Sequence, residues 1–153
     1  MKRSSFTGIL LLAVIILMGA CGEGSAYDEL PKPIADFVSQ YFPFGEVDEY
    51  TVDNAGNSVV KIRNGATLSF DADCDWTDIN GNGSVLPANF LYNQLPPVLY
   101  DYIESLEFTN NVYRTIRTLT GVRVEFRDTY VEYDDATQAI TYPDGEVKNA
   151  SKI

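Results

Sequence analysis

The stretches that decide the fold are "LPKPIADFVSQYF" (residues 30–42) and "LPPVLYDYIESLEF" (residues 95–108), which carry the same pattern. In each, a Leu-Pro pair precedes apolar side chains spaced i, i+3, i+4 and i+7, which marks one face of a helix. A proline suits the first helical turn, where its missing N–H removes no intrahelical hydrogen bond. The apolar positions are Ile34, Phe37, Val38 and Tyr41 in the first helix, and Leu99, Tyr102, Ile103 and Leu106 in the second.

A hairpin pattern follows each predicted helix. The segments "VVKIRNGATLSFDAD" (59–73) and "VRVEFRDTYVEYDDA" (122–136) alternate apolar and polar residues with period two, as strands with one buried face do. The short turns "RNGA" and "RDT" join the two strands of each hairpin. Further strands are expected near 46–52, 74–79, 111–118 and 138–142. The chain therefore predicts a helix and about four strands, twice.

A single unit of roughly 50 residues would bury too little apolar surface to be stable alone. Two units can share one sheet and cover one of its faces with their helices. We therefore predict an α+β fold of two tandem repeats, at about 30–82 and 95–145, within one domain spanning 30–150. The helices should pack on one face of a shared antiparallel sheet.

The first 21 residues, "MKRSSFTGILLLAVIILMGAC", have the pattern of a secretory signal. Two basic residues precede an apolar stretch from Ile9 to Met18, which is too short to span a bilayer as a stable helix. Gly19 and Ala20 then precede Cys21, as in a bacterial lipobox. We predict a signal peptide over 1–20, lipid on Cys21 and a linker over 21–29. An ordinary signal cleaved near Ala20, or a short anchor, is the alternative.

These features predict a protein secreted across the inner membrane and anchored by its lipid in the cell envelope, at the outer membrane facing the periplasm. The membrane would be contacted only through that lipid. Removing Lys2 and Arg3, and no acidic residue, takes the formal charge from −11 to −13. So acidic a surface repels phosphate backbones, which argues against a nucleic-acid partner.

The composition also bears on catalysis. The chain contains no histidine, which excludes Ser-His-Asp and Cys-His catalysis and every His-ligated metal site. Cys74 lies between Asp73 and Asp75, whose carboxylates disfavour a reactive thiolate. We therefore expect no enzymatic activity and no cofactor.

The segment "DINGNGSV" (78–85) resembles part of a calcium loop, with Asp78, Asn80 and Asn82 at its first, third and fifth places. The twelfth place holds Asn89, where such a loop needs a bidentate carboxylate. Asp, Asn and Gly also form tight turns without any ion. We favour a turn between the two repeats, and keep a calcium site at Asp78, Asn80 and Asn82 as the alternative.

The Leu-Pro helix, a hairpin ending in "SFDADCDW" (69–76) and the return of this pattern behind a lipoprotein signal resemble the PepSY-like family. This family, also described as beta-lactamase-inhibitor-like, contains secreted or lipid-anchored Bacteroidetes proteins. Phe70-Asp71, Trp76 and Leu86-Pro87 match its pattern, whereas Tyr133 replaces its phenylalanine in the second repeat. The resemblance covers residues 30 to about 145. It implies helices on one face of an antiparallel sheet and no established activity.

The aromatic residues indicate a function for the other face of the sheet. Several tyrosines fall on the parity opposite to the apolar positions, and Tyr and Arg are enriched at contact hot spots. Tyrosine is also common on antiparallel sheets in general. We predict a non-enzymatic module, inhibitor-like in one form, that binds an envelope protein or peptide; the alternative is a small-ligand or calcium-binding envelope protein. The predicted contact residues are Tyr50, Tyr113, Arg123, Arg127 and Tyr130, with Trp76 near the rim.

Overall fold

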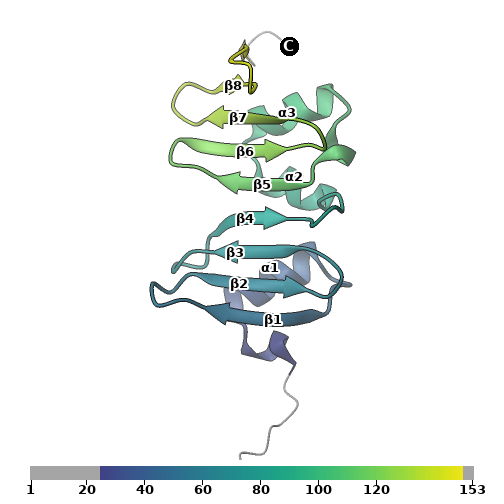
Figure 1. Cartoon of the computed structure of the whole chain (residues 1–153), viewed down its shortest axis with the longest axis vertical. Helices are drawn as coiled ribbons and strands as arrows, with labels where there is room; N and C mark the ends of the chain where they lie inside the picture. The colour runs from purple at the N-terminus through teal and green to yellow at the C-terminus, as the bar shows by residue number, and fades with distance from the viewer. Residues whose placement is uncertain (1–24, 150–153) are drawn as a thin grey trace, which may run out of the picture.

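A computed structural model describes residues 25–149. The chain forms one antiparallel sheet of nine strands, whose order across the sheet is their order along the chain (Figure 1). The strands are β1 (Val47–Val52), β2 (Ser58–Ile62), β3 (Thr67–Phe70), β4 (Trp76–Asn80), β5 (Arg114–Arg117), β6 (Gly121–Glu125), β7 (Tyr130–Asp134), β8 (Ala139–Thr141) and β9 (Val147–Asn149).

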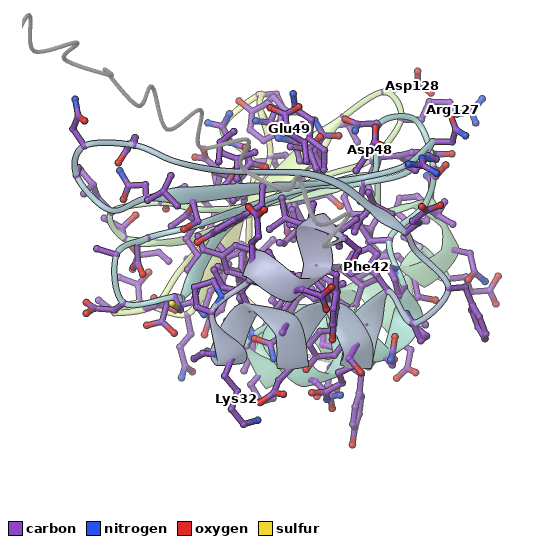
Figure 2. All side chains as sticks on the ribbon, turned by 90° about the horizontal axis from the view of Figure 1, so that it is seen from below. Lys32, Phe42, Asp48, Glu49, Arg127 and Asp128 are labelled. Carbon is purple, nitrogen blue, oxygen red and sulfur yellow. The ribbon has the colours of Figure 1, made fainter. Side chains whose placement is uncertain are left out.

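The helices lie on one face of this sheet. They are α1 (Lys32–Tyr41), α2 (Ala88–Gln94) and α3 (Pro97–Ser105), with the short 3-10 helices η1 (Ala26–Glu29) and η2 (Thr109–Asn111). Figure 1 shows α1 behind β1 to β3, and α2 and α3 behind the later strands. In Figure 2, Glu49 lies on the side of the sheet away from the helices, whereas Lys32 lies on the helical side. We call the side without helices the open face.

The core lies between the helices and the sheet. On the helical side, Ile34 and Leu99 are fully buried, as both predicted apolar faces require. The sheet contributes alternate residues, which point to one side of a strand. The fully buried strand residues are Val60, Leu68, Phe70, Ile79, Thr115, Val124, Val131 and Ile140. The predicted α+β architecture, an antiparallel sheet with helices packed on it, is confirmed.

Four elements are additional to the predicted helix and four strands of each repeat, and one of them is η2, which follows α3. Helix α2 fills the segment between the two predicted repeats, and Phe90 and Leu91 bury its inner face. Strand β9 adds a short edge after β8. The predicted linker 21–29 contains η1, where Asp28 accepts a hydrogen bond from the backbone N–H of Ser25 and so closes a local turn.

The predicted signal peptide (1–20) and Cys21 lie outside the described residues. Within residues 25–149, no helix is long and apolar enough to cross a membrane.

Candidate functional site

Two rows of side chains cross the open face, because directly paired residues of antiparallel strands point to the same side. The first row is Glu49, Lys61, Thr67, Asn80, Arg114, Glu125 and Tyr130. The second row is Thr51, Val59, Ser69, Asp78, Ile116, Arg123, Glu132 and Thr141. The open face is therefore polar and charged, with few apolar side chains.

Arg114 is fixed at the centre of this face. Its Nε and Nη2 donate to Asp78 Oδ1 and Oδ2 at 2.9 and 2.5 Å, and its Nη1 lies 3.8 Å from Glu125 Oε2. The hydrogen bond to Asp78 is the largest cause that raises the pKa of Arg114 above its ordinary value. A guanidinium held by two carboxylates stays charged and oriented, which reduces the entropy lost on contact with a partner.

Arg123 is held in the same manner one strand further along. Its Nε and Nη2 donate to Glu132 Oε1 at 2.9 and 2.5 Å, and its guanidinium lies 4.6 Å from the centroid of the Tyr130 ring. The hydrogen bond to Glu132 raises the pKa of Arg123. Because the ion pair and the ring contact act together, the Arg123 side chain presents a defined surface.

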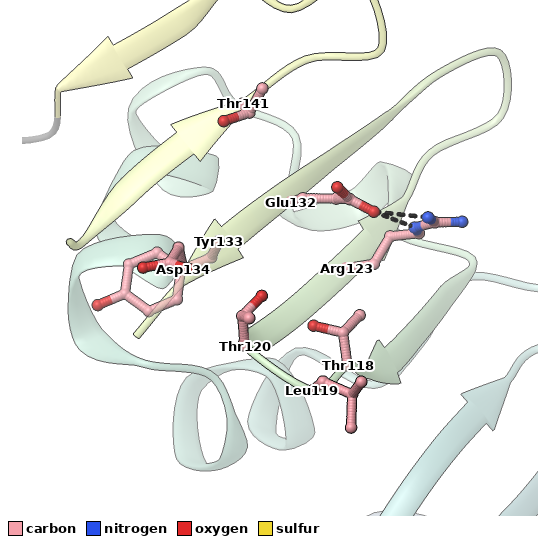
Figure 3. Close-up of a pocket in the computed structure, with 8 residues that line it drawn as sticks. All are labelled: Thr118, Leu119, Thr120, Arg123, Glu132, Tyr133, Asp134 and Thr141. Carbon is pink, nitrogen blue, oxygen red and sulfur yellow. Dashed lines mark hydrogen bonds and ion pairs between the residues drawn. The ribbon is translucent and has the colours of Figure 1, made fainter. Parts of the chain in front are cut away.

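A shallow depression of about 520 Å³ adjoins this pair. Figure 3 shows the paired Arg123 and Glu132 at one side of it, and Thr118, Leu119 and Thr120 of the turn between β5 and β6 at another. Leu119, in that turn, is fully exposed. An exposed leucine beside an ordered arginine provides an apolar contact next to a charged one, a combination that protein partners use.

The structure groups four of the six predicted contact residues into two pairs. Arg123 and Tyr130 meet on the open face, as described. Arg127 and Tyr113 meet at an end of the sheet, where Arg127 Nη2 donates to the Tyr113 hydroxyl at 2.9 Å. Tyr113 is half-buried just before β5, and Arg127 is exposed in the turn after β6. The second pair therefore lies at the rim and not in the middle of the face.

The prediction that Tyr50 lies on the open face is wrong. The register between β1 and β2 shifts between Val47 and Glu49, which inverts the expected parity of the strand. Tyr50 consequently pairs with the buried residue Val60 and faces the helices, half-buried, with its hydroxyl 3.5 Å from Ser58 Oγ.

The prediction that Trp76 lies near the rim of the open face is also wrong. Trp76 is only 3% exposed. A register shift between Ser69 and Phe70 places Trp76 opposite Phe70. The centroids of the Trp76 and Phe90 rings are 5.6 Å apart. The indole Nε1 donates to Gln94 Oε1 at 2.9 Å, so that its polar atom is satisfied within the core.

The candidate calcium residues face separate partners. Asp78 is bound by Arg114, whereas Asn80 Oδ1 accepts the backbone N–H of Asn82 at 2.8 Å. Asn82 points its amide nitrogen at Gly65 O and Thr67 Oγ1, both at 2.9 Å. Only the two asparagine side chains stabilise the turn before α2. Within residues 25–149, no three acidic, Cys or His side chains form a metal-binding group.

Glu132 and Arg114 are among the residues of the open-face site that sequence reasoning missed. Glu132 could have been found, because the predicted hairpin turn at "RDT" fixes a register that places it beside Arg123. Arg114 could not have been found in this way, because it contacts Asp78, which lies 36 residues away in the sequence. No local sequence pattern indicates that two strands so far apart are paired.

Comparison with known proteins shows similarity in fold. No family model matches the chain, and no curated protein matches it in sequence. A Bacteroides vulgatus protein of the DUF2874 family, provisionally assigned to the periplasm, superimposes with a TM-score of 0.60 at 19% identity, over 80% of this chain and 93% of that one. A second Bacteroides vulgatus protein, provisionally periplasmic and of unknown function, gives 0.60 at 16% identity, over 80% and 94%.

A third similar structure comes from Bacteroides thetaiotaomicron. It is provisionally described as a calcium-regulated periplasmic protein, and it superimposes with a TM-score of 0.62 at 16% identity, over 80% of this chain and 93% of that one. At such identities, these likenesses show that the fold is shared.

Proposed function

We propose that this protein is a non-enzymatic envelope lipoprotein that binds a protein or peptide through the open face of its sheet. The observation that carries the proposal is the ordered pair of Arg123 and Tyr130 on a face that no helix of residues 25–149 covers. Arginine and tyrosine carry much of the binding energy in protein interfaces. Side chains that are already fixed lose little further entropy when a partner binds.

The proposed contact surface is centred on β5 to β7. Arg114, Arg123 and Tyr130 form its ordered part, and Ile116 of β5 pairs with Arg123 on the same face. Leu119 and the depression beside it extend the surface to the end of the sheet. Arg127 and Tyr113 form its opposite rim.

The proposed location is the outer membrane, facing the periplasm, with lipid on Cys21. The lipobox at the end of the apolar signal supports it. The periplasmic assignments of the similar Bacteroides structures support the periplasmic part of this proposal.

We also propose that the chain is a duplicated unit of the PepSY-like, beta-lactamase-inhibitor-like type. Helices α1 and α3 both begin after a Leu-Pro pair, and β1 to β4 follow the first as β5 to β8 follow the second. The hairpins β2–β3 and β6–β7 occupy the same place in each half. Helix α2 is then an insertion between the two units.

The proposal is tested with the variant Arg123→Ala combined with Tyr130→Ala, used as bait on native envelope extracts. We expect binding of the captured partner to weaken by about 2 kcal/mol or more, roughly thirtyfold. The melting temperature should change little, because both side chains are partly exposed on the open face. The matched control is Lys32→Ala, whose side chain is 85% exposed on the helical side.

Full capture by the stably folded double variant would contradict the proposal. A companion variant, Tyr113→Ala combined with Tyr130→Ala, separates the rim from the middle of the face. If only this companion variant loses the partner, then the contact surface is centred on Tyr113 and Arg127.

A second candidate function is a calcium response, favoured by the description of the Bacteroides thetaiotaomicron structure. The Asp78 carboxylate would have to leave Arg114 before it could bind an ion. We therefore place the calcium response second to partner binding. A calcium titration of the purified protein distinguishes the two functions.

A further inference from the structure

A second cavity lies where the junction of α2 and α3 meets the turn between β5 and β6. Its volume is about 330 Å³, at the lower end of the range for small-molecule sites. Gln94, Leu95 and Pro96 line it from the helical layer, and Trp76, Arg117 and Asp135 line it from the sheet and its turns. It is distinct from the depression beside Arg123, which lies across the β5–β6 turn.

Arg117 is unusual among the basic residues that the structure describes. Its guanidinium lies 4.5 Å from the centroid of the Trp76 ring. A side-chain hydrogen bond is formed by each of six other basic residues, Lys32, Lys61, Arg63, Arg114, Arg123 and Arg127. The Arg117 side chain forms no hydrogen bond and no ion pair within residues 25–147. Acidic residues outnumber basic ones by 22 to 11, so partners for an arginine are abundant. Arg117 thus presents unused donors to the cavity.

Asp135 lines the same cavity from the turn after β7. Its carboxylate forms no ion pair with any described residue, Arg117 included. The two opposite charges are therefore farther apart than the roughly 4 Å of an ion pair. The lining of this cavity thus carries one positive and one negative side chain that do not neutralise each other in an ion pair.

We propose that this cavity binds a small zwitterion with a free carboxylate and a free ammonium group, as in amino acids and short peptides. Arg117 binds the carboxylate through charge-assisted hydrogen bonds, which are the stronger class. Asp135 accepts from the ammonium group, and Pro96 provides an apolar wall. The site lies off the open face, so this inference does not depend on the proposed function.

Trp76 supplies the measurement, because it is the only tryptophan in the chain. A ligand that draws the Arg117 guanidinium toward a carboxylate changes the charge above the indole ring. The fluorescence of Trp76 and its single indole N–H signal in an NMR spectrum should therefore both respond. The probes are L-alanine, the dipeptide Ala-Ala, Ala-Ala with an amidated C-terminus, and Ala-Ala with an acetylated N-terminus.

We expect saturable binding of L-alanine or of Ala-Ala, and the tighter of the two identifies a free amino acid or a peptide as the ligand. Blocking the carboxylate, blocking the amine and the variant Arg117→Gln should each weaken binding about tenfold or more, as expected for lost charge-assisted hydrogen bonds. Arg63→Gln is the matched control, since it makes the same change at an arginine of the opposite end of the sheet and should leave the affinity unchanged.

Three results would each overturn the inference. They are no response in either spectrum to L-alanine or Ala-Ala, equal binding of a blocked and an unblocked dipeptide, and unchanged affinity in a folded Arg117→Gln variant. Partner capture through Arg123 is measured separately, so failure here leaves the proposed function as it stands.

Discussion

Arg114 of β5 donates hydrogen bonds to both carboxylate oxygens of Asp78 of β4. This bidentate ion pair joins the first four strands to the next four. The two side chains are 34% and 27% exposed, so the ion pair is partly shielded from water. A bidentate and partly shielded contact is worth more than an ordinary surface ion pair. Because the Arg114–Asp78 ion pair joins β4 to β5, we expect it to stabilise the contact between these two groups of strands.

The first prediction is that the Arg114–Asp78 ion pair contributes measurably to the free energy of unfolding. A double-mutant cycle with Asp78→Ala and Arg114→Ala should give a coupling free energy of about 1 kcal/mol in urea unfolding. The matched cycle uses Lys32 and Asp36, an exposed pair one helical turn apart, and should give about 0.3 kcal/mol. Equal coupling in the two cycles would show that shielding at the sheet centre adds nothing.

The second prediction concerns calcium. Millimolar calcium should shift the melting temperature little, because stabilisation grows as RT ln(1 + [L]/Kd) and Asp78 is already bound by Arg114. The measurement is thermal unfolding with and without calcium, and with magnesium as the control. A rise of many degrees that Asp78→Ala abolishes would make the calcium response the leading function.

The third prediction concerns Cys21. Replacing Cys21 by Ser should release the protein from the membrane fraction, because the serine hydroxyl replaces the thiol that would carry the lipid. Fractionation and the intact mass of the mature protein test this, and Cys74→Ser is the control for loss of a thiol. A Ser variant that stays membrane-bound, or a native protein without acyl mass, would refute lipidation.

The fourth prediction compares two glycines. A Cβ at Gly121 would lie 2.0 Å from the Tyr133 backbone oxygen, so Gly121→Ala must displace β6 from β7 and should cost about 2 kcal/mol or more. Gly83 has open space around it but a φ of +93°, so Gly83→Ala should cost about 1 kcal/mol. Chemical denaturation measures both, and the reverse order would contradict the described register of β6 and β7.

The helices and hairpins were accessible from the sequence because their signals are local. The spacing of Ile34 and Val38, for example, reports which face of α1 is buried, and the structure buries that face. The hairpin strands likewise follow from alternation and short turns. The α+β architecture was predictable for these reasons.

The errors at Tyr50 and Trp76 have one physical cause. Each lies on a strand pairing whose register shifts, and a shift of one residue sends a side chain to the other face. Alternation in the sequence does not reveal which strand contains the extra residue. The pair of Arg123 and Tyr130 lies on strands with regular pairing, and there the predicted parity holds.

The strand order has a kinetic consequence. Every strand pairs only with its neighbours along the chain, although residues 81–113, which contain α2, α3 and η2, separate β4 from β5. Sequence-local pairing favours rapid folding, because few long loops must close. The sheet can then form by adding one strand at a time to a first hairpin. It can also unfold locally, one strand at a time, from its two edges. Amide protons in β1 and β9 should exchange with solvent soonest, and those in the middle strands should exchange last.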